Sequence, residues 1–171
     1  MVDDDRWAVL ERRVAALEAA QVQERAASAT GPETAGEASP LWALEGLRAR
    51  VPDPGAVMLT GAVTLPDGRA AQWQEGADTG SLLAEDWGEV ADALAALGSP
   101  VRLRLLQRVL TGTGTVAELV QGEGVGTSGQ VYHHVRQLVA AGWLRSAGGG
   151  RYEVPVPRVV PLLAAVVGAR R

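Results

Sequence analysis

Residues 115–154 constrain the fold of this chain more than any other stretch, because two helix-start signals precede a strand-like segment. Thr115 and Thr127 each stand three residues before a Glu or Gln, which is the spacing of a capping box. Three glycines fall within positions 121–126, so a helix cannot continue through them. The pattern predicts two short helices joined by a tight turn, the second over about 128–141 with a glycine stop after it.

A hairpin is predicted directly after the second helix. Residues 143–146 and 151–154 alternate in strand fashion around Ala147 and three consecutive glycines, which would bring Arg145 and Arg151 near the tip. Helix, turn, helix and hairpin in this order indicate a winged helix-turn-helix. In that fold the second helix enters the major groove of DNA.

The second helix is predicted to have one apolar and one polar face. At about 100° per residue, the apolar stripe consists of Val131, Val135, Leu138 and Val139. The opposite face holds amide, imidazole and guanidinium groups without an acid, and such groups can bind base edges or phosphates. Gly129 would let the backbone come close, and His134 would flank the stripe. The predicted DNA-binding residues are Thr127, Ser128, Gln130, Tyr132, His133, Arg136, Gln137, Arg145 and Arg151.

Four runs occur in a fixed order in the second half of the chain: ALAALGSPVRLRLLQRVL, TVAEL, GTSGQVYHHVRQLVAAGWL and GRYEV. Together they resemble the winged helix-turn-helix domain of ArsR-type bacterial transcription regulators, over about residues 87–156. The resemblance implies a homodimer that binds an imperfect palindrome of double-stranded DNA, commonly as a repressor. It also implies that a terminal helix joins the dimer interface.

Many regulators of this type sense metal ions, but the expected ligands are missing here. The helix that often carries a Cys pair reads TVAELV, and the terminal helix that often carries Asp and His reads RVVPLLAAVVGA. His133 and His134 are neighbours, so on a helix they point in different directions and cannot chelate one ion together. We expect no metal and no cofactor. A nucleophile elbow and a phosphate loop are also absent from the sequence, so we expect no enzyme.

Charge is distributed unevenly along the chain, although the net charge is only −4. Residues 99–151 hold six Arg against two acids, whereas residues 1–98 hold seven Arg against seventeen acids. A basic segment within an acidic chain is typical of a DNA-binding domain, because phosphate contacts are local. The sequence contains no cysteine, no leader-like N-terminus and no long apolar run. We therefore expect a cytoplasmic protein without a membrane span.

The N-terminal part is predicted to contain an amphipathic, coiled-coil-like helix at residues 1–25 and a flexible linker at 26–40. A seam of about two heptads is short for an autonomous coiled coil, so it would pair only with help from another contact. The alternative is a helix that packs on its own domain. The predicted dimer interface combines this seam with the terminal helix: Trp7, Leu10, Val14, Leu17, Val159, Leu163 and Val166.

Residues 41–80 are predicted to form a helix and a β-hairpin extension of unknown role. The hairpin spans about residues 56–75 around a Pro-Asp-Gly turn. An isolated hairpin is marginal in water, so this one must pack on Trp42 and Leu47 or pair with a second copy. It would be either a sensing or dimerisation module, open to a small-molecule or protein effector, or structural padding.

Residues 81–171 complete the predicted winged helix-turn-helix domain. A helix over 81–97 precedes a second one that starts at Pro100, and the terminal helix begins around Arg158. The expected fold class is mainly α with small β-hairpins, that is, α+β. The competing function is a winged-helix protein–protein interaction module, with the acidic N-terminal half as its signalling part.

Overall fold

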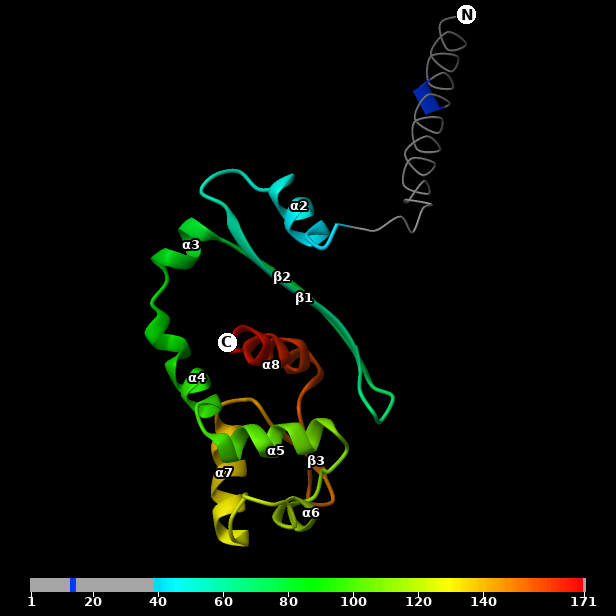
Figure 1. Cartoon of the computed structure of the whole chain (residues 1–171), viewed down its shortest axis with the longest axis vertical. Helices are drawn as coiled ribbons and strands as arrows, with labels where there is room; N and C mark the ends of the chain where they lie inside the picture. Colours follow the sequence, from blue (N-terminus) through cyan, green and yellow to red (C-terminus); the bar gives the residue numbers. More distant parts are fainter. Residues whose placement is uncertain (1–12, 15–38, 171) are drawn as a thin grey trace, which may run out of the picture. The chain divides into compact units, whose positions relative to one another are not determined.

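The structure is a computed structural model that describes residues 13–14 and 39–170. It divides the chain into two units, residues 1–45 and 46–171, and the contacts given below lie within one unit. The described part is α+β (Figure 1). Its elements are α2 (Trp42–Arg48), β1 (Ala56–Thr64), β2 (Ala70–Asp78), α3 (Thr79–Ala84), the 3-10 helix η1 (Trp87–Val90), α4 (Ala91–Leu97), α5 (Pro100–Leu110), α6 (Val116–Val120), α7 (Ser128–Ala140), β3 (Arg145–Gly148), β4 (Arg151–Glu153) and α8 (Val156–Gly168).

Little of the N-terminal prediction falls on described residues. Val14 lies in a helix and is half-exposed, whereas Trp7, Leu10 and Leu17 lie outside the described residues. Before α2, the Ser39 hydroxyl oxygen accepts a hydrogen bond from the Leu41 N–H at 3.2 Å.

The predicted hairpin is present and longer than expected, with β2 reaching Asp78. Its strands are antiparallel, with Gly61 opposite Trp73, and Gly68 in the turn has a φ of 82°. The inner face of the hairpin packs on α8. A Cβ atom at Gly61 would lie 2.7 Å from Val160 Cγ1, so only glycine permits this approach. The hairpin therefore packs on α8 of the same chain, a partner that no sequence pattern indicates.

The single helix predicted over residues 81–97 is wrong, because this segment forms α3, η1 and α4. Two aspartates begin new helical turns. Asp78 accepts from the Ser81 N–H and Asp86 from the Gly88 N–H, both at 2.8 Å, and each interaction satisfies a donor that the helix leaves unpaired. The break leaves Trp87 and Leu94 on the surface, 58% and 59% exposed.

Helices α5, α6 and α7 and the hairpin β3–β4 follow in the predicted order. The Thr115–Glu118 capping box is formed in both directions, at 2.9 and 3.3 Å. The Tyr152 N–H donates to the Gly114 carbonyl oxygen at 2.7 Å, which attaches β4 to the segment before α6. This arrangement is compatible with a winged helix.

Helix α8 begins at Val156, two residues before the predicted start, and continues through Pro161. Val159 is fully buried in the core of its own chain, so its assignment to a dimer interface is wrong. Leu163 is partly buried against the same core, whereas Val166 and Val167 are exposed. The core thus combines residues of the hairpin, α5, α7 and α8. Among residues 13–14 and 39–170, every helix is too short or too polar to cross a lipid bilayer.

Candidate nucleic-acid interface

Helix α7 has the two faces that the sequence predicts. Val131, Val135 and Leu138 are completely buried, which fixes the helix on the core. Val139 was expected in this stripe, but it is exposed on the flank. The predicted contact residues of α7 lie on the solvent side: Ser128, Gln130, Tyr132, His133, Arg136 and Gln137.

Two glutamines of α7 already use their carbonyl oxygens within the chain. Gln130 Oε1 accepts from the Thr127 N–H at 2.8 Å and from the Thr127 hydroxyl at 3.3 Å. Gln137 Oε1 accepts from Arg102 Nη1 at 2.8 Å. A bidentate contact to adenine needs both the oxygen and the nitrogen of an amide. Only the NH₂ groups of these glutamines are therefore available to a base edge, unless an internal hydrogen bond breaks.

The arginines of α5 bind backbone carbonyl groups. Arg102 Nη2 donates to the Ala95 carbonyl oxygen at 2.8 Å, at the end of α4. Arg104 Nη1 donates to the Gly124 carbonyl oxygen at 3.1 Å, and Arg108 Nη2 to the Glu118 carbonyl oxygen at 3.0 Å. They hold the ends of α4 and α6 and the turn between α6 and α7.

The turn glycines make space for these side chains, a role that sequence reasoning missed. A Cβ atom at Gly122 would lie 2.8 Å from Arg108 Nη1, and one at Gly124 would meet Arg104 Nη1. The turn was recognised only as a helix break. Two arginines four residues apart, followed by two glycines two residues apart, are the sequence signal that could have indicated the packing.

The wing β3–β4 places its two arginines at opposite ends. Arg151 follows the glycine turn, where Gly148, Gly149 and Gly150 all have positive φ. Arg145 pairs with Glu153 at the open end of the hairpin, so its predicted place near the tip is wrong. The Arg151 guanidinium lies over Gly114, and its charge adds to the hydrogen bonds of Thr115 that lower the pKa of Glu118.

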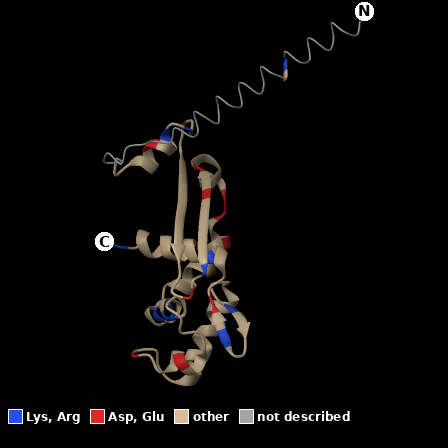
Figure 2. Cartoon of the chain, turned by 90° about the vertical axis from the view of Figure 1, so that its right-hand side faces the viewer, with Lys and Arg blue, Asp and Glu red and all other residues tan. Residues whose placement is uncertain are grey.

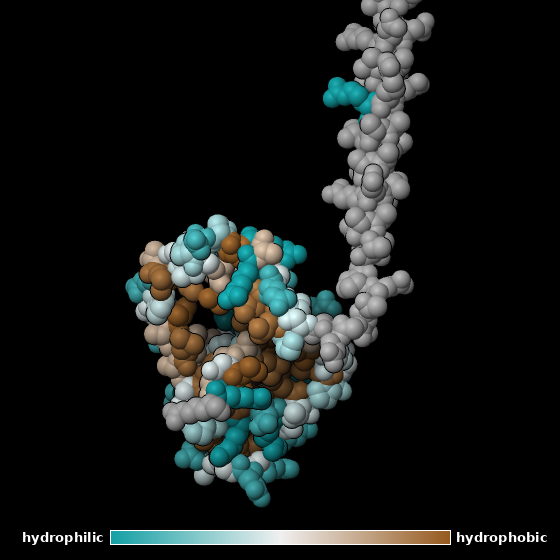
Figure 3. All heavy atoms as spheres, turned by 45° about the horizontal axis from the view of Figure 1, so that its top comes forward, coloured by the Kyte–Doolittle hydropathy of each residue, from teal (hydrophilic) through white to brown (hydrophobic). Residues whose placement is uncertain are grey.

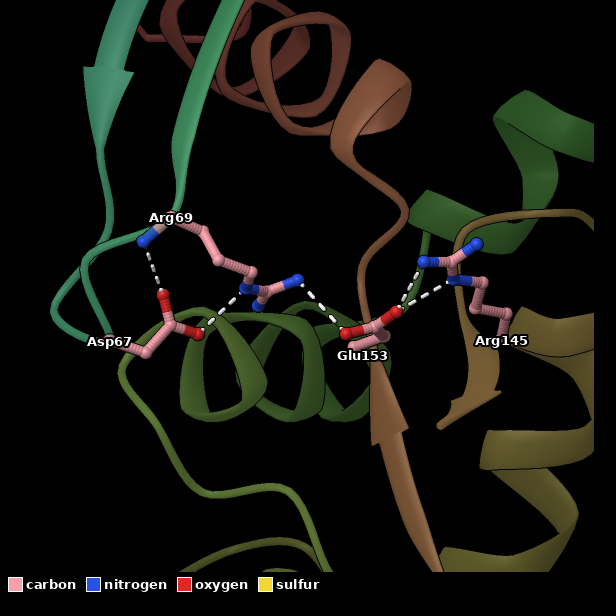
Figure 4. A network of polar contacts seen from close by, with 4 residues as sticks. All are labelled: Asp67, Arg69, Arg145 and Glu153. Carbon is pink, nitrogen blue, oxygen red and sulfur yellow. Dashed lines mark hydrogen bonds and ion pairs between the residues drawn. The ribbon is translucent and has the colours of Figure 1, made fainter. Parts of the chain in front are cut away.

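A network of ion pairs joins the turn of β1–β2 to the wing (Figure 4). Arg69 Nη1 lies 3.0 Å from Glu153 Oε2, and Arg145 Nη2 lies 2.6 Å from Glu153 Oε1. Arg69 Nε also lies 2.8 Å from Asp67 Oδ2. The backbone N–H of Arg69 and then its side chain lower the pKa of Asp67. Residues 69 and 153 are far apart in sequence, so no local pattern indicates this contact.

The predicted contact residues therefore differ in whether their side chains already have partners within the chain. Within the described part of the chain, the side chains of His133, Arg136 and Arg151 form neither a hydrogen bond nor an ion pair. Figure 2 shows basic residues on the wing, whereas residues 70–101 carry acids without a Lys or Arg.

In the described ranges, no cluster of three His, Cys, Asp or Glu residues could hold a metal ion. The rings of His133 and His134 are 5.7 Å apart and edge to face.

Comparisons of the chain with protein-family models, curated proteins and solved structures find no match.

Proposed function

We propose that this chain is a sequence-specific, DNA-binding transcription regulator of ArsR type, acting in the bacterial cytoplasm as a homodimeric repressor without metal ligands. The observation that carries the proposal is the position of α7. Its apolar side is fully buried, whereas its exposed side presents His133 and Arg136 without an acid. A helix held in this way can enter the major groove as a rigid body, with the following wing beside it.

The second copy is proposed to cover an apolar surface on the segment from α3 to α4 and at the end of α8. This surface consists of Leu83, Trp87, Val90, Leu94, Val166 and Val167, all substantially exposed. Figure 3 shows apolar residues across the middle of one face of this unit. Large exposed apolar patches are typical of an interface. The N-terminal seam remains a further predicted contact.

A direct test is to select DNA fragments bound by the full chain from a random pool at stated salt, and then to measure variants on the selected site. Arg136→Ala should cost about 1 to 3 kcal/mol and relax the preference for one base. Arg151→Ala should weaken all sequences alike and reduce the salt slope by about one. Arg48→Ala removes one exposed charge that lies outside α7 and the wing, and it serves as the control.

One observation favours the second candidate, a winged-helix module that binds protein. Arg102, Arg104 and Arg108 of α5 all donate hydrogen bonds to backbone carbonyl groups within the chain. Fewer cations are then free for phosphates than the basic segment suggests. Failure to select any DNA would reject the DNA-binding function and leave this candidate. Unchanged affinity of Arg136→Ala and Arg151→Ala for the selected DNA would reject α7 and the wing as the contact surface.

A further inference from the structure

Glu153 lies between two arginines that come from different parts of the fold. Its Oε2 atom pairs with Arg69 Nη1 at 3.0 Å, and its Oε1 atom accepts from Arg145 Nε at 2.7 Å (Figure 4). Arg69 belongs to the β1–β2 hairpin and Arg145 begins β3 of the wing. Each carboxylate oxygen thus binds one element, and the carboxylate connects the two.

The contact leaves part of Arg145 open to solvent. Both its Nε and Nη2 atoms approach the same oxygen of Glu153, so this edge of the guanidinium is occupied. The side chain of Arg145 remains 62% exposed, whereas that of Glu153 is 22% exposed. A guanidinium bound on one edge keeps donors on the other, and their planar geometry suits a phosphate.

The other end of the network is anchored on the core. Asp67 Oδ1 accepts from the Arg69 N–H at 3.0 Å, and Asp67 Oδ2 accepts from Arg69 Nε at 2.8 Å. These hydrogen bonds hold Arg69 against its own turn. The hairpin is in turn fixed by its packing on α8, with Leu65 and Ala71 buried in the core. The position of Arg69 is therefore set by the core.

We propose that the β1–β2 hairpin is a positioning element for nucleic-acid binding. Asp67, Arg69 and Glu153 hold Arg145 with its free guanidinium edge turned outward, and this edge binds a phosphate of the DNA backbone. The proposal rests on the proposed DNA-binding function. It assigns Asp67, Arg69 and Glu153 as positioning residues and Arg145 as the residue that touches the nucleic acid.

Charge and position predict opposite effects for two substitutions. Glu153→Gln and Asp67→Asn each make the chain more positive by one charge. If these acids only neutralise nearby arginines, their removal strengthens DNA binding. If they position Arg145, their removal weakens binding, because the arginine loses its fixed orientation and regains conformational freedom. The sign of the change therefore separates the two roles.

The test measures affinity for the selected DNA over a range of salt concentrations, using the full chain and these two variants. We expect each variant to bind roughly threefold to tenfold more weakly. The control is Glu75→Gln, which removes an acid of the same hairpin whose carboxylate contacts Trp73 Nε1 at 3.2 Å, and it should not weaken binding. In an Arg145→Ala background, Glu153→Gln should have no further effect.

A second variant addresses geometry without a change in charge. Arg69→Lys keeps one positive charge but replaces the planar fork, so we expect it to weaken DNA binding in the same direction as Glu153→Gln. Circular dichroism would check that each variant remains folded. Two results would overturn the positioning role while leaving DNA binding intact. One is tighter DNA binding by Glu153→Gln, and the other is that Glu153→Gln weakens binding as much in the Arg145→Ala background as in the wild-type chain. A wild-type chain that binds no DNA would overturn both.

Discussion

The guanidinium of Arg108 occupies the space that a side chain at Gly122 would need, because a Cβ atom there would lie 2.8 Å from Arg108 Nη1. We expect Gly122→Ala to displace Arg108 from the Glu118 carbonyl oxygen, at a cost of about 1 kcal/mol in the free energy of unfolding. Chemical denaturation would measure this. In an Arg108→Ala background the same change should cost almost nothing, and an equal cost in both backgrounds would contradict the packing role.

Replacing Gly129 by alanine should change stability in the opposite direction to Gly122→Ala. A Cβ atom there would meet no atom within 4 Å, and its backbone is helical without a positive φ. Gly129→Ala should therefore stabilise the chain by roughly 0.5 to 1 kcal/mol. It should also weaken DNA binding if the backbone approaches the nucleic acid there. Gly68→Ala has equally open space but a φ of 82°, so it should destabilise the chain instead.

The apolar surface around Trp87 and Leu94 predicts the effect of a charge on association. Leu94→Glu should reduce dimer formation in sedimentation velocity and lower the apparent affinity for a palindromic site. Because Leu94 is 59% exposed, the thermal stability of the single chain should change little. Leu103→Glu changes an exposed leucine of α5 and serves as the control. A Leu94→Glu chain with unchanged association would place the dimer contact elsewhere.

Glu118 predicts part of the acid sensitivity of the fold. The hydrogen bonds from Thr115, backbone first and side chain second, hold the pKa of Glu118 below its ordinary value of 4.5. Its contribution to stability is therefore present above pH 4.5 and is lost as the pH falls through the lower folded-state pKa. Glu118→Gln should flatten the fall of the melting temperature below pH 4.5, since glutamine already fills the same capping position at Gln130. Glu123→Gln, at an exposed site in the turn, is the control for the loss of one charge.

Local signals predicted much of the fold correctly. The Pro-Asp-Gly turn between two β-rich runs indicated the hairpin, and the Thr–Glu and Thr–Gln spacings indicated the starts of α6 and α7. These features depend on residues within a few positions of one another. The break at Asp86 was also local, but the apolar spacing of Trp87, Val90 and Leu94 suggested a continuous helix more strongly. Their exposure shows that this periodicity did not indicate burial within the chain.

Contacts between distant residues could not be read from the sequence. An apolar helix such as α8 can cover its own hairpin or a second copy, and its periodicity is the same in both cases. The close approach of Val160 to Gly61 shows that most of α8 covers the hairpin of its own chain. The candidate site shows the same limit, because the exposed face of α7 was predicted correctly whereas the pairing of Arg145 with Glu153 was not.

The packing of α8 on β1–β2 also imposes an order on biosynthesis. Gly61 and Val160 are separated by roughly a hundred residues, so a ribosome needs on the order of five to twenty seconds to extend the chain from one to the other. During this interval the nascent hairpin has no cover for Leu59, Val63 and Trp73. A two-stranded hairpin is marginal alone in water, so stable pairing of these strands must await the translation of the last helix. The β1–β2 hairpin therefore leaves the ribosome well before it can become stable.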